Sequence, residues 1–322
     1  MDRIIKITVP TPFAVGDVNA YLIVDGKELV LVDGGPFTKD AKEALTAEVC
    51  HAGYQMQDIK AAVITHYHPD HAGLAHWLQS EFGTKIVASS GSVPFFSDDS
   101  AFYESRLSFY SKLYKTHGMP QDLGEHELKK LKHYRSFCPS FLPDMIIFGS
   151  SLSILPEWEV LYVPGHSPDH IALYNSASSE LIGGDVLLPH ISSNALIEPD
   201  LDGSTRLKTL LQYRETLQHI RTLEPQTVYP GHGDVFHNAA ALIEQRLNDH
   251  EQRAQHILRI ITEEPSTAFS AAAQLFGRLY KKEAGLVLSE VLGHLDLLEE
   301  RKLAMHELTI EKVKHYSAGV KL

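Results

Sequence analysis

The segment Thr65-His66-Tyr67-His68-Pro69-Asp70-His71-Ala72-Gly73 concentrates four potential metal ligands, His66, His68, Asp70 and His71, within six residues. It directly follows the apolar run Ala61–Ile64, whose length and composition predict a strand. Functional sites of α/β folds lie at the carboxyl ends of strands. Imidazole and carboxylate groups together form a common ligand set for zinc and related divalent ions. The segment therefore predicts a metal site that begins where this strand ends.

Spacing within the segment allows its side chains to share ions. His66 and His68 stand at positions i and i+2 of an extended stretch, so they project to the same side. Pro69 suits the start of the following helix, which places Asp70 and His71 in the first helical turn. A carboxylate is electrostatically favoured at that helix end. A polar turn with exposed histidines is the alternative, and it is disfavoured because ligand-type segments recur downstream.

Three further loops with potential ligands follow predicted strands, and each is flanked by glycine or proline. One such loop alone is ordinary. Four in one chain favour a shared metal site over chance. The three segments are Val163–His170, Ile182–Val186 and Tyr229–Gly233, and their candidate ligands are His166, Asp185 and His232.

Short apolar runs alternate with helical patterns up to about residue 235, which predicts an α/β fold. The predicted strands are Val18–Val24, Leu29–Val32, Ala61–Ile64, Lys85–Ala88, Glu159–Val163, Ile171–Tyr174, Leu181–Ile182 and Thr227–Tyr229. The predicted helices are Lys39–Gly53, Ala72–Phe82 and Thr205–Leu223.

The chain beyond about residue 238 is mostly helical. It predicts helices over Ala254–Thr262, Thr267–Leu279 and Leu286–Glu300, followed by a two-stranded hairpin over Leu303–Ile310 and Lys312–Ser317. Three helices followed by a hairpin are the shape of a winged-helix module.

The order His-x-His-x-Asp-His, then His, then Asp, then His resembles that of the metallo-β-lactamase-fold hydrolases. The resemblance covers roughly residues 1–250 and implies an αββα sandwich with two divalent metal ions at one edge. It implies that Asp33 supports the site from behind the ligands. The ligands it implies are His66, His68 and His166 for one metal, Asp70, His71 and His232 for the other, and Asp185 as a bridge between them.

This resemblance predicts a catalytic domain over residues 1–250 with a helical insert at about 92–145. A small winged-helix-like domain is expected over residues 251–322, similar to the C-terminal domain of one hydrolase branch of the family. The insert carries an aromatic stripe at helical spacing, which is expected either to pack on the sandwich or to form a lid over the site. That stripe consists of Tyr103, Leu107, Tyr110, Tyr114 and His117.

Asp185 occupies the position at which β-lactamases with two zinc ions use cysteine, and neither Cys50 nor Cys138 falls in a ligand loop. The sequence thus resembles the glyoxalase-II, lactonase, phosphodiesterase and ribonuclease branches more than the true β-lactamases. Two metals about 3.5–4 Å apart can hold a water between them and lower its pKa to about 7. We expect a bridging hydroxide to attack the substrate, with Asp70 and Asp185 as catalytic ligands.

The expected substrate is a small carboxylic ester, thioester or lactone, acyl-linked or bound to coenzyme A. Zinc is favoured over iron and manganese for its coordination preferences. The alternative within the same fold is a phosphodiesterase or ribonuclease, because a basic run in the insert could grip phosphates. That run contains Lys129, Lys130, Lys132, His133 and Arg135.

A non-catalytic DNA-binding protein is a further alternative, and charge disfavours it. The 322 residues hold 29 Lys and Arg against 41 Asp and Glu, a net charge of −12. Residues 245–322 hold 11 of each sign, whereas modules that read DNA normally carry excess positive charge. The two cysteines, the absence of an apolar leader in Met1–Lys6 and the lack of a long apolar stretch favour a cytoplasmic protein without a membrane span.

Overall fold

The structure is a computed structural model that describes residues 3–25 and 28–319, so Met1 and Asp2 of the N-terminal segment lie outside it. By its internal contacts the chain divides into two compact units, each assembled from three segments of sequence. The sheet unit comprises residues 1–99, 133–193 and 219–242, and the helical unit comprises 100–132, 194–218 and 243–322. Residues 100–132 of the insert and the C-terminal tail therefore belong to one unit. Separate domains over residues 1–250 and 251–322 remain a prediction.

The first sheet of the sheet unit has six strands in the order β1-β2-β3-β4-β5-β6. The first three strands are antiparallel, and β3 to β6 run parallel. The strands predicted at 18–24, 29–32, 61–64 and 85–88 are all confirmed, and β1 was missed. The strands are β1 (Arg3–Val9), β2 (Val18–Asp25), β3 (Glu28–Val32), β4 (Ile59–Ile64), β5 (Lys85–Ser89) and β6 (Met145–Ile147).

The second sheet has five strands in the order β11-β10-β9-β8-β7. Its inner face shares one buried cluster with the first sheet, in which Tyr21, Val30 and Val63 lie with Ile171 and Ile182. The two sheets are therefore packed face to face. The strands are β7 (Glu159–Tyr162), β8 (Ile171–Asn175), β9 (Glu180–Gly184), β10 (Thr227–Pro230) and β11 (Phe236–His237).

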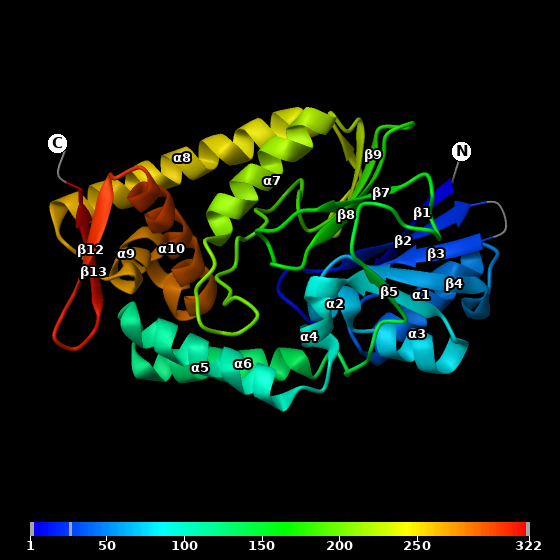
Figure 1. The fold of residues 1–322 in the computed structure, drawn as a ribbon, viewed down its shortest axis with the longest axis horizontal. Helices are drawn as coiled ribbons and strands as arrows, with labels where there is room; N and C mark the ends of the chain where they lie inside the picture. Colours follow the sequence, from blue (N-terminus) through cyan, green and yellow to red (C-terminus); the bar gives the residue numbers. More distant parts are fainter. Residues whose placement is uncertain (1–2, 26–27, 320–322) are drawn as a thin grey trace. The chain divides into compact units, whose positions relative to one another are not determined.

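Helices cover the other face of the first sheet (Figure 1). Leu45 of α1 and Leu78 of α3 are fully buried in a cluster with Ile7 and Leu22 of the sheet. The fold is thus the mixed α/β architecture expected from the resemblance. The helical elements of this part are α1 (Lys39–His51), η1 (Met56–Asp58), α2 (Pro69–Ala72), α3 (Ala75–Phe82), η2 (Ser90–Ser92) and α4 (Val93–Phe96).

The helix predicted over 72–82 is interrupted at Gly73. A Cβ at this position would overlap the carbonyl oxygen of Phe137 and lie 2.5 Å from that of Pro69. The backbone there is packed too closely for a side chain, and the chain bends between α2 and α3. The first helical segment starts at Pro69 with Asp70 and His71 in its first turn, as the position of the proline predicts, and the second segment starts at Ala75.

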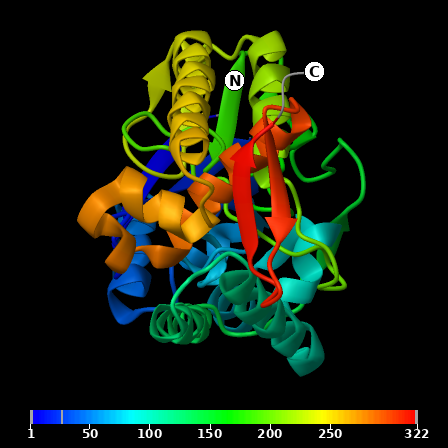
Figure 2. The same ribbon diagram turned by 90° about the vertical axis from the view of Figure 1, so that its left-hand side faces the viewer.

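The helical unit contains residues 100–132 of the insert, part of α7, most of α8 and the tail (Figure 2). The three tail helices and the hairpin predicted from the sequence are present, although α8 starts well before residue 254. Among the described residues, no helix is both long and apolar enough to span a membrane. The elements are α5 (Ser100–Thr116), α6 (Gln121–Arg135), α7 (Thr209–Leu223), α8 (Ala239–Glu263), α9 (Ala268–Phe276), η3 (Gly277–Lys281), α10 (Ala284–Glu300), β12 (Ala304–Leu308) and β13 (Lys314–Ala318).

Helix α7 begins at Thr209, four residues later than predicted. Arg206 instead forms a β-bridge with Pro199, and its guanidinium binds the Asp296 carboxylate of α10 at 2.5 and 2.6 Å. The β-bridge and this ion pair keep Arg206 out of the helix, and an amphipathic pattern alone gives no sign of them.

The aromatic stripe of the insert packs against the tail helices. Tyr110 and Tyr114 are each 7% exposed and belong to one buried cluster with Leu288, Val291 and Leu292 of α10. The Tyr110 hydroxyl donates to the carbonyl oxygen of Ile197 at 3.1 Å. These two tyrosines are therefore core residues of the helical unit.

We expect Tyr110→Ala to destabilise the protein by about 3–5 kcal/mol, the usual cost of deleting a large buried aromatic side chain. The KM of the folded fraction should stay unchanged, because the Tyr110 side chain packs in the core and does not contact the substrate. Thermal melts together with steady-state kinetics check both points. Lys115→Ala, on the exposed side of the same helix, is the control. A raised KM with an unchanged melting temperature would restore the lid interpretation.

Two buried histidines face each other inside the helical unit. His250 of α8 and His294 of α10 lie with ring centroids 5.8 Å apart. Burial, followed by His294 and the positive charges of Arg214 and Arg246, lowers the pKa of His250 to about 3. Burial also lowers the pKa of His294. Both imidazoles are thus neutral in the folded protein at neutral pH.

This burial should make the stability of the protein sensitive to acid. An unfolded histidine titrates near pH 6.5, so below that pH the unfolded state binds more protons than the folded state. For His250, the stability is at its full value above about pH 6.5 and falls as the pH decreases towards 3, by up to about 1.4 kcal/mol per pH unit. The lowered pKa of His294 adds a loss of the same sign. Urea denaturation at pH 7.5, 6.5 and 5.5 measures the free energy of unfolding at each pH. This free energy should decrease less steeply with falling pH in His250→Met than in the wild type. Equal slopes in the two proteins would contradict the prediction.

Candidate metal centre

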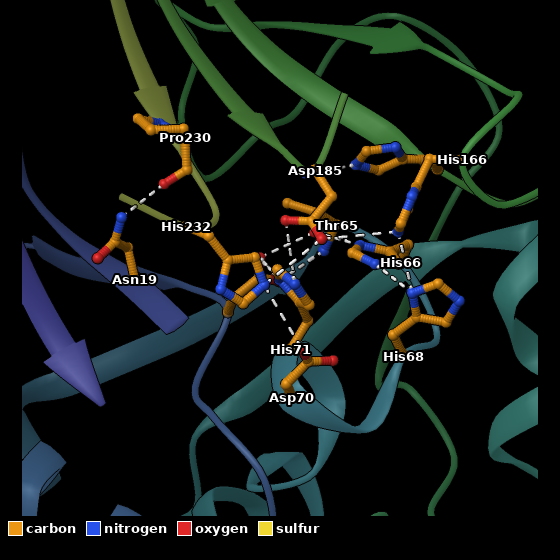
Figure 3. Close-up of polar contacts among 12 residues, drawn as sticks. Asn19, Thr65, His66, His68, Asp70, His71, His166, Asp185, Pro230 and His232 are labelled. Carbon is orange, nitrogen blue, oxygen red and sulfur yellow. Dashed lines mark hydrogen bonds and ion pairs between the residues drawn. The ribbon is translucent and has the colours of Figure 1, made fainter. Parts of the chain in front are cut away.

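All seven predicted ligands lie in the sheet unit, and they converge at the carboxyl ends of strands (Figure 3). His66 and His68 follow β4, and Asp70 and His71 lie in the short helix α2. The other three come from the second sheet, where His166 follows β7, Asp185 follows β9 and His232 follows β10. Residues more than 160 positions apart in sequence therefore meet at one edge of the two sheets.

Three histidines form the first group of donors. The Nδ1 atom of His68 lies 3.0 Å from Nε2 of His66 and 3.0 Å from Nε2 of His166. His66 is fully buried and His166 is nearly so. Three imidazole nitrogens facing one another at this distance have the arrangement of a shared metal ligand set.

Asp70, His71 and His232 form the second group, and Asp185 lies between the two groups. His232 Nε2 lies 3.5 Å from Asp70 Oδ2. One Asp185 oxygen, Oδ1, lies 3.3 Å from His71 Nε2. The other, Oδ2, lies 3.5 Å from His232 Nε2 and 3.6 Å from His166 Nε2. The Asp185 carboxylate thus reaches both groups at once.

Hydrogen bonds behind the ligands set which imidazole nitrogen carries a lone pair. Asp33 accepts from the backbone N–H and the hydroxyl of Thr65 and from His71 Nδ1, all at 2.8 Å. Since the single hydroxyl hydrogen of Thr65 goes to Asp33, its oxygen accepts from His66 Nδ1 at 3.0 Å. His232 Nδ1 donates to the carbonyl oxygen of Asp17 at 2.7 Å. In the neutral imidazoles of all three histidines, these bonds occupy Nδ1 and direct the lone pair of Nε2 to the centre of the site.

Several of these buried atoms have no hydrogen-bond partner. Among the described residues they include His71 Nε2, His232 Nε2 and Asp185 Oδ1. Two of these atoms, His71 Nε2 and Asp185 Oδ1, lie 3.3 Å apart but do not form a hydrogen bond with each other. Buried polar atoms are costly to leave unpaired, and an ion bound among them would satisfy all three. The donor set therefore fits divalent metal ions.

Burial and neighbouring charges shift the pKa values of the donors in two directions. Burial lowers the pKa of His66 well below its usual value and that of His68 to about 3, so both imidazoles are neutral. Burial by itself would raise the pKa of Asp185, but His71 and His232 outweigh it and hold that pKa well below its usual range. Against burial, Asp185 in turn raises the pKa of His71 well above its usual value and that of His232 to about 10. The site thus combines the neutral imidazoles of His66 and His68 with an ionised carboxylate, and an ion bound by His71 and His232 would displace their protons.

Other polar residues flagged in the sequence lie around these donors or away from them. His170, expected to be structural, is buried, and its Nε2 accepts from the backbone N–H of Asp185 at 3.3 Å. His190, Ser192 and Asn194, which follow Asp185 along the chain, are all exposed. Sequence reasoning missed Asn19, whose hydrogen bonds reach the turn that carries His232.

Comparisons with known proteins agree with this geometry. A family model described as "Metallo-beta-lactamase superfamily" matches residues 14–232. A Bacillus subtilis (strain 168) protein named "Probable metallo-hydrolase YqjP" is 39% identical over 298 residues, which is 92% of each chain. An Aspergillus fumigatus protein named "Atrochrysone carboxyl ACP thioesterase" is 23% identical over 241 residues, covering 74% of this chain and 58% of that protein.

Similarity to solved structures extends over almost the whole chain. The crystal structure of a metallo-beta-lactamase family protein from Thermus thermophilus superposes with a TM-score of 0.82 and 25% identity, covering 98% of both chains. Both the catalytic core and the remaining segments thus have counterparts in a single solved protein. With the family model and a relative of 39% identity in agreement, the chain belongs to the metallo-beta-lactamase superfamily.

Proposed function

We propose that this protein is a hydrolase that binds two divalent metal ions, with Asp185 shared between them. The observation that carries the proposal is the convergence of seven buried or half-buried donors, several without any other partner. Seven ligands exceed what one tetrahedral ion can use. In this proposal His66, His68 and His166 hold one ion, and Asp70, His71 and His232 hold the other.

Bound divalent ions supply Lewis acidity, which lowers the pKa of a coordinated water to about 7. The protein's own contribution is the placement of charge. Asp70 and Asp185 bring two negative charges to a site whose other donors are imidazoles. Asp33 fixes His71 through a 2.8 Å hydrogen bond, and so keeps Nε2 aimed at the site. The donors are nitrogen and oxygen only, a set that zinc, iron and manganese all accept, and zinc is favoured for its coordination preferences.

The substrate class we favour is a small carboxylic ester, thioester or lactone, including acyl groups carried on coenzyme A. The observation that supports it is a relative with 23% identity that is named a thioesterase. The carboxylate at position 185, with no cysteine ligand in the site, speaks against a β-lactam substrate. The overall charge of −12 is unfavourable for a polyanionic substrate such as RNA.

A phosphodiesterase is the second candidate, and the basic run in the insert is the feature that favours it. Lys129 and Lys132 are exposed in that run. Lys130, however, lies 3.5 Å from Glu127 and 3.3 Å from Glu283, so its charge is already paired. The run therefore offers fewer free positive charges for binding phosphate than its sequence indicates.

We further infer that the tail forms a winged-helix-like module that does not read DNA. Helices α9 and α10 followed by the β12–β13 hairpin support the first part. The balanced charge of residues 245–322 supports the second, because binding to duplex DNA depends on clustered cations. Leu288, Val291 and Leu295 of α10 are at most 1% exposed, so this helix serves as core.

Elemental analysis and a substrate panel test the proposal together. Gently purified protein should contain close to two metal equivalents per chain. The metal-loaded protein should hydrolyse thioesters, aryl esters or lactones faster than phosphodiesters, short RNA or nitrocefin. One equivalent or none at full activity would overturn the dinuclear centre. Preferred cleavage of RNA or phosphodiesters would overturn the ester assignment and support the second candidate.

A further inference from the structure

One residue of the first sheet, Asn19 in β2, makes three hydrogen bonds to the turn that follows β10 in the second sheet. Its side-chain amide donates to the carbonyl oxygens of Pro230 and Gly233, each at 2.8 Å. Its backbone N–H donates to the carbonyl oxygen of Gly231 at 2.7 Å. Asn19 is 3% exposed. Figure 3 shows its amide pointing at Pro230, beside His232.

The same stretch of β2 and the loop before it contact this turn twice more. The Tyr21 hydroxyl donates to the Pro230 carbonyl oxygen at 2.6 Å. The Asp17 carbonyl oxygen accepts from His232 Nδ1 at 2.7 Å. Residues 17–21 therefore form hydrogen bonds with both ends of the four-residue turn, Pro230 and Gly233, and with the imidazole of His232.

The turn has almost no freedom on its other side. Gly231 lies so close to Asp185 and His71 that a Cβ at position 231 would overlap Asp185 Oδ1 and lie 2.8 Å from His71 Cε1. A shift of this turn therefore changes where His232 Nε2 stands relative to Asp70 and Asp185.

We propose that Asn19 is a positioning residue for the second metal ion, acting through the Pro230–Gly233 turn on His232. This inference rests on the proposed dinuclear centre. The role requires an uncharged group with two N–H donors, because both groups that face the side chain are carbonyl acceptors. An aspartate has the same size and offers only acceptors when ionised, so it would repel both carbonyls.

The effect should be confined to one of the two ions. His66 and His68 follow β4 and His166 follows β7, whereas the three hydrogen bonds of Asn19 all go to the turn after β10. Loss of the Asn19 amide thus weakens the group that contains His232 and leaves the three-histidine group intact. Removal of a group that orients a metal ligand typically costs 10- to 100-fold in metal affinity.

Stepwise titration of the metal-free full-length protein with Co²⁺, in competition with a chelator, tests this. Asn19→Asp and Asn19→Ala should weaken the second dissociation constant about 10- to 100-fold and change the first by less than about threefold. The visible absorption of the second Co²⁺ should shift, since its geometry changes. Tyr21→Phe, which removes one bond to the same carbonyl, should have a smaller effect in the same direction.

Asn175 provides the matched control. It is also buried, and its side chain accepts hydrogen bonds from the backbone of Ala177 and Ser178 in the β8–β9 turn. Asn175→Asp and Asn175→Ala should retain both dissociation constants even where they lower the melting temperature. Wild-type second-metal affinity in folded Asn19→Asp and Tyr21→Phe would overturn the role of Asn19. A wild type that never binds a second ion would instead overturn the dinuclear centre itself.

Discussion

Replacement of Asp185 by asparagine is expected to strip both metal ions and to lower kcat/KM by more than about 100-fold. The Asp185 carboxylate reaches His71, His166 and His232 at 3.3–3.6 Å, so it belongs to both donor groups. Asparagine keeps the shape and removes the one negative charge that the two ions would share. Loss of an outer-shell partner already costs 10- to 100-fold, and a shared ligand should cost more.

Metal content by mass spectrometry and steady-state kinetics on the same preparation measure this effect. The control is Asp234→Asn, which removes a carboxylate near the His232 turn whose side chain is 88% exposed. It should keep both metals and wild-type kinetics. Two tightly held equivalents in Asp185→Asn would show that the carboxylate is not a shared ligand.

Gly231→Ala is expected to disrupt the site as severely, although it removes no ligand. The added Cβ would overlap Asp185 Oδ1, lie 2.8 Å from His71 Cε1 and lie 3.1 Å from the backbone of Gly184. Gly184 is backbone, His71 is fixed by its hydrogen bond to Asp33, and Asp185 is enclosed by the ligand histidines, so the turn itself must move. Overpacking of a rigid region costs about 1–3 kcal/mol, and here it also displaces His232.

We therefore expect Gly231→Ala to lose at least one metal equivalent and to melt at a lower temperature. Gly149→Ala is the matched control, because nothing lies within 4 Å of a Cβ at that position. It should retain the metal content and stability of the wild type. If Gly231→Ala kept full metal content and activity, the close contact between this turn and Asp185 would not be required for metal binding.

The ligand loops were predictable from sequence because their signals are local. His66, His68, Asp70 and His71 fall within six residues, directly after a buried apolar run. His166, Asp185 and His232 each follow a recognisable strand as well. Where parallel strands end at one edge, short-range patterns suffice to place side chains together.

What the sequence could not reveal are the contacts between distant segments. Asn19 and Pro230 are 211 positions apart, and no residue pattern marks an amide that donates to backbone carbonyls. The stripe containing Tyr110 and Tyr114 likewise indicated an apolar face without its partner. Its partners are the tail helices, about 180 positions later, and not the sheets. Periodicity identifies which side of a helix is buried and says nothing about what buries it.

The long separation between residues 17–21 and the Pro230–Gly233 turn also affects the order in which the two donor groups are completed during synthesis. Three histidines suffice for the first donor group, and the last of them, His166, leaves the ribosome some 66 residues before His232. Contacts between distant segments form late, because the connecting loop must first close. We expect a nascent chain to be able to capture one ion before the second group exists. A single-metal species would then be a normal stage in maturation, seen when synthesis outpaces metal supply.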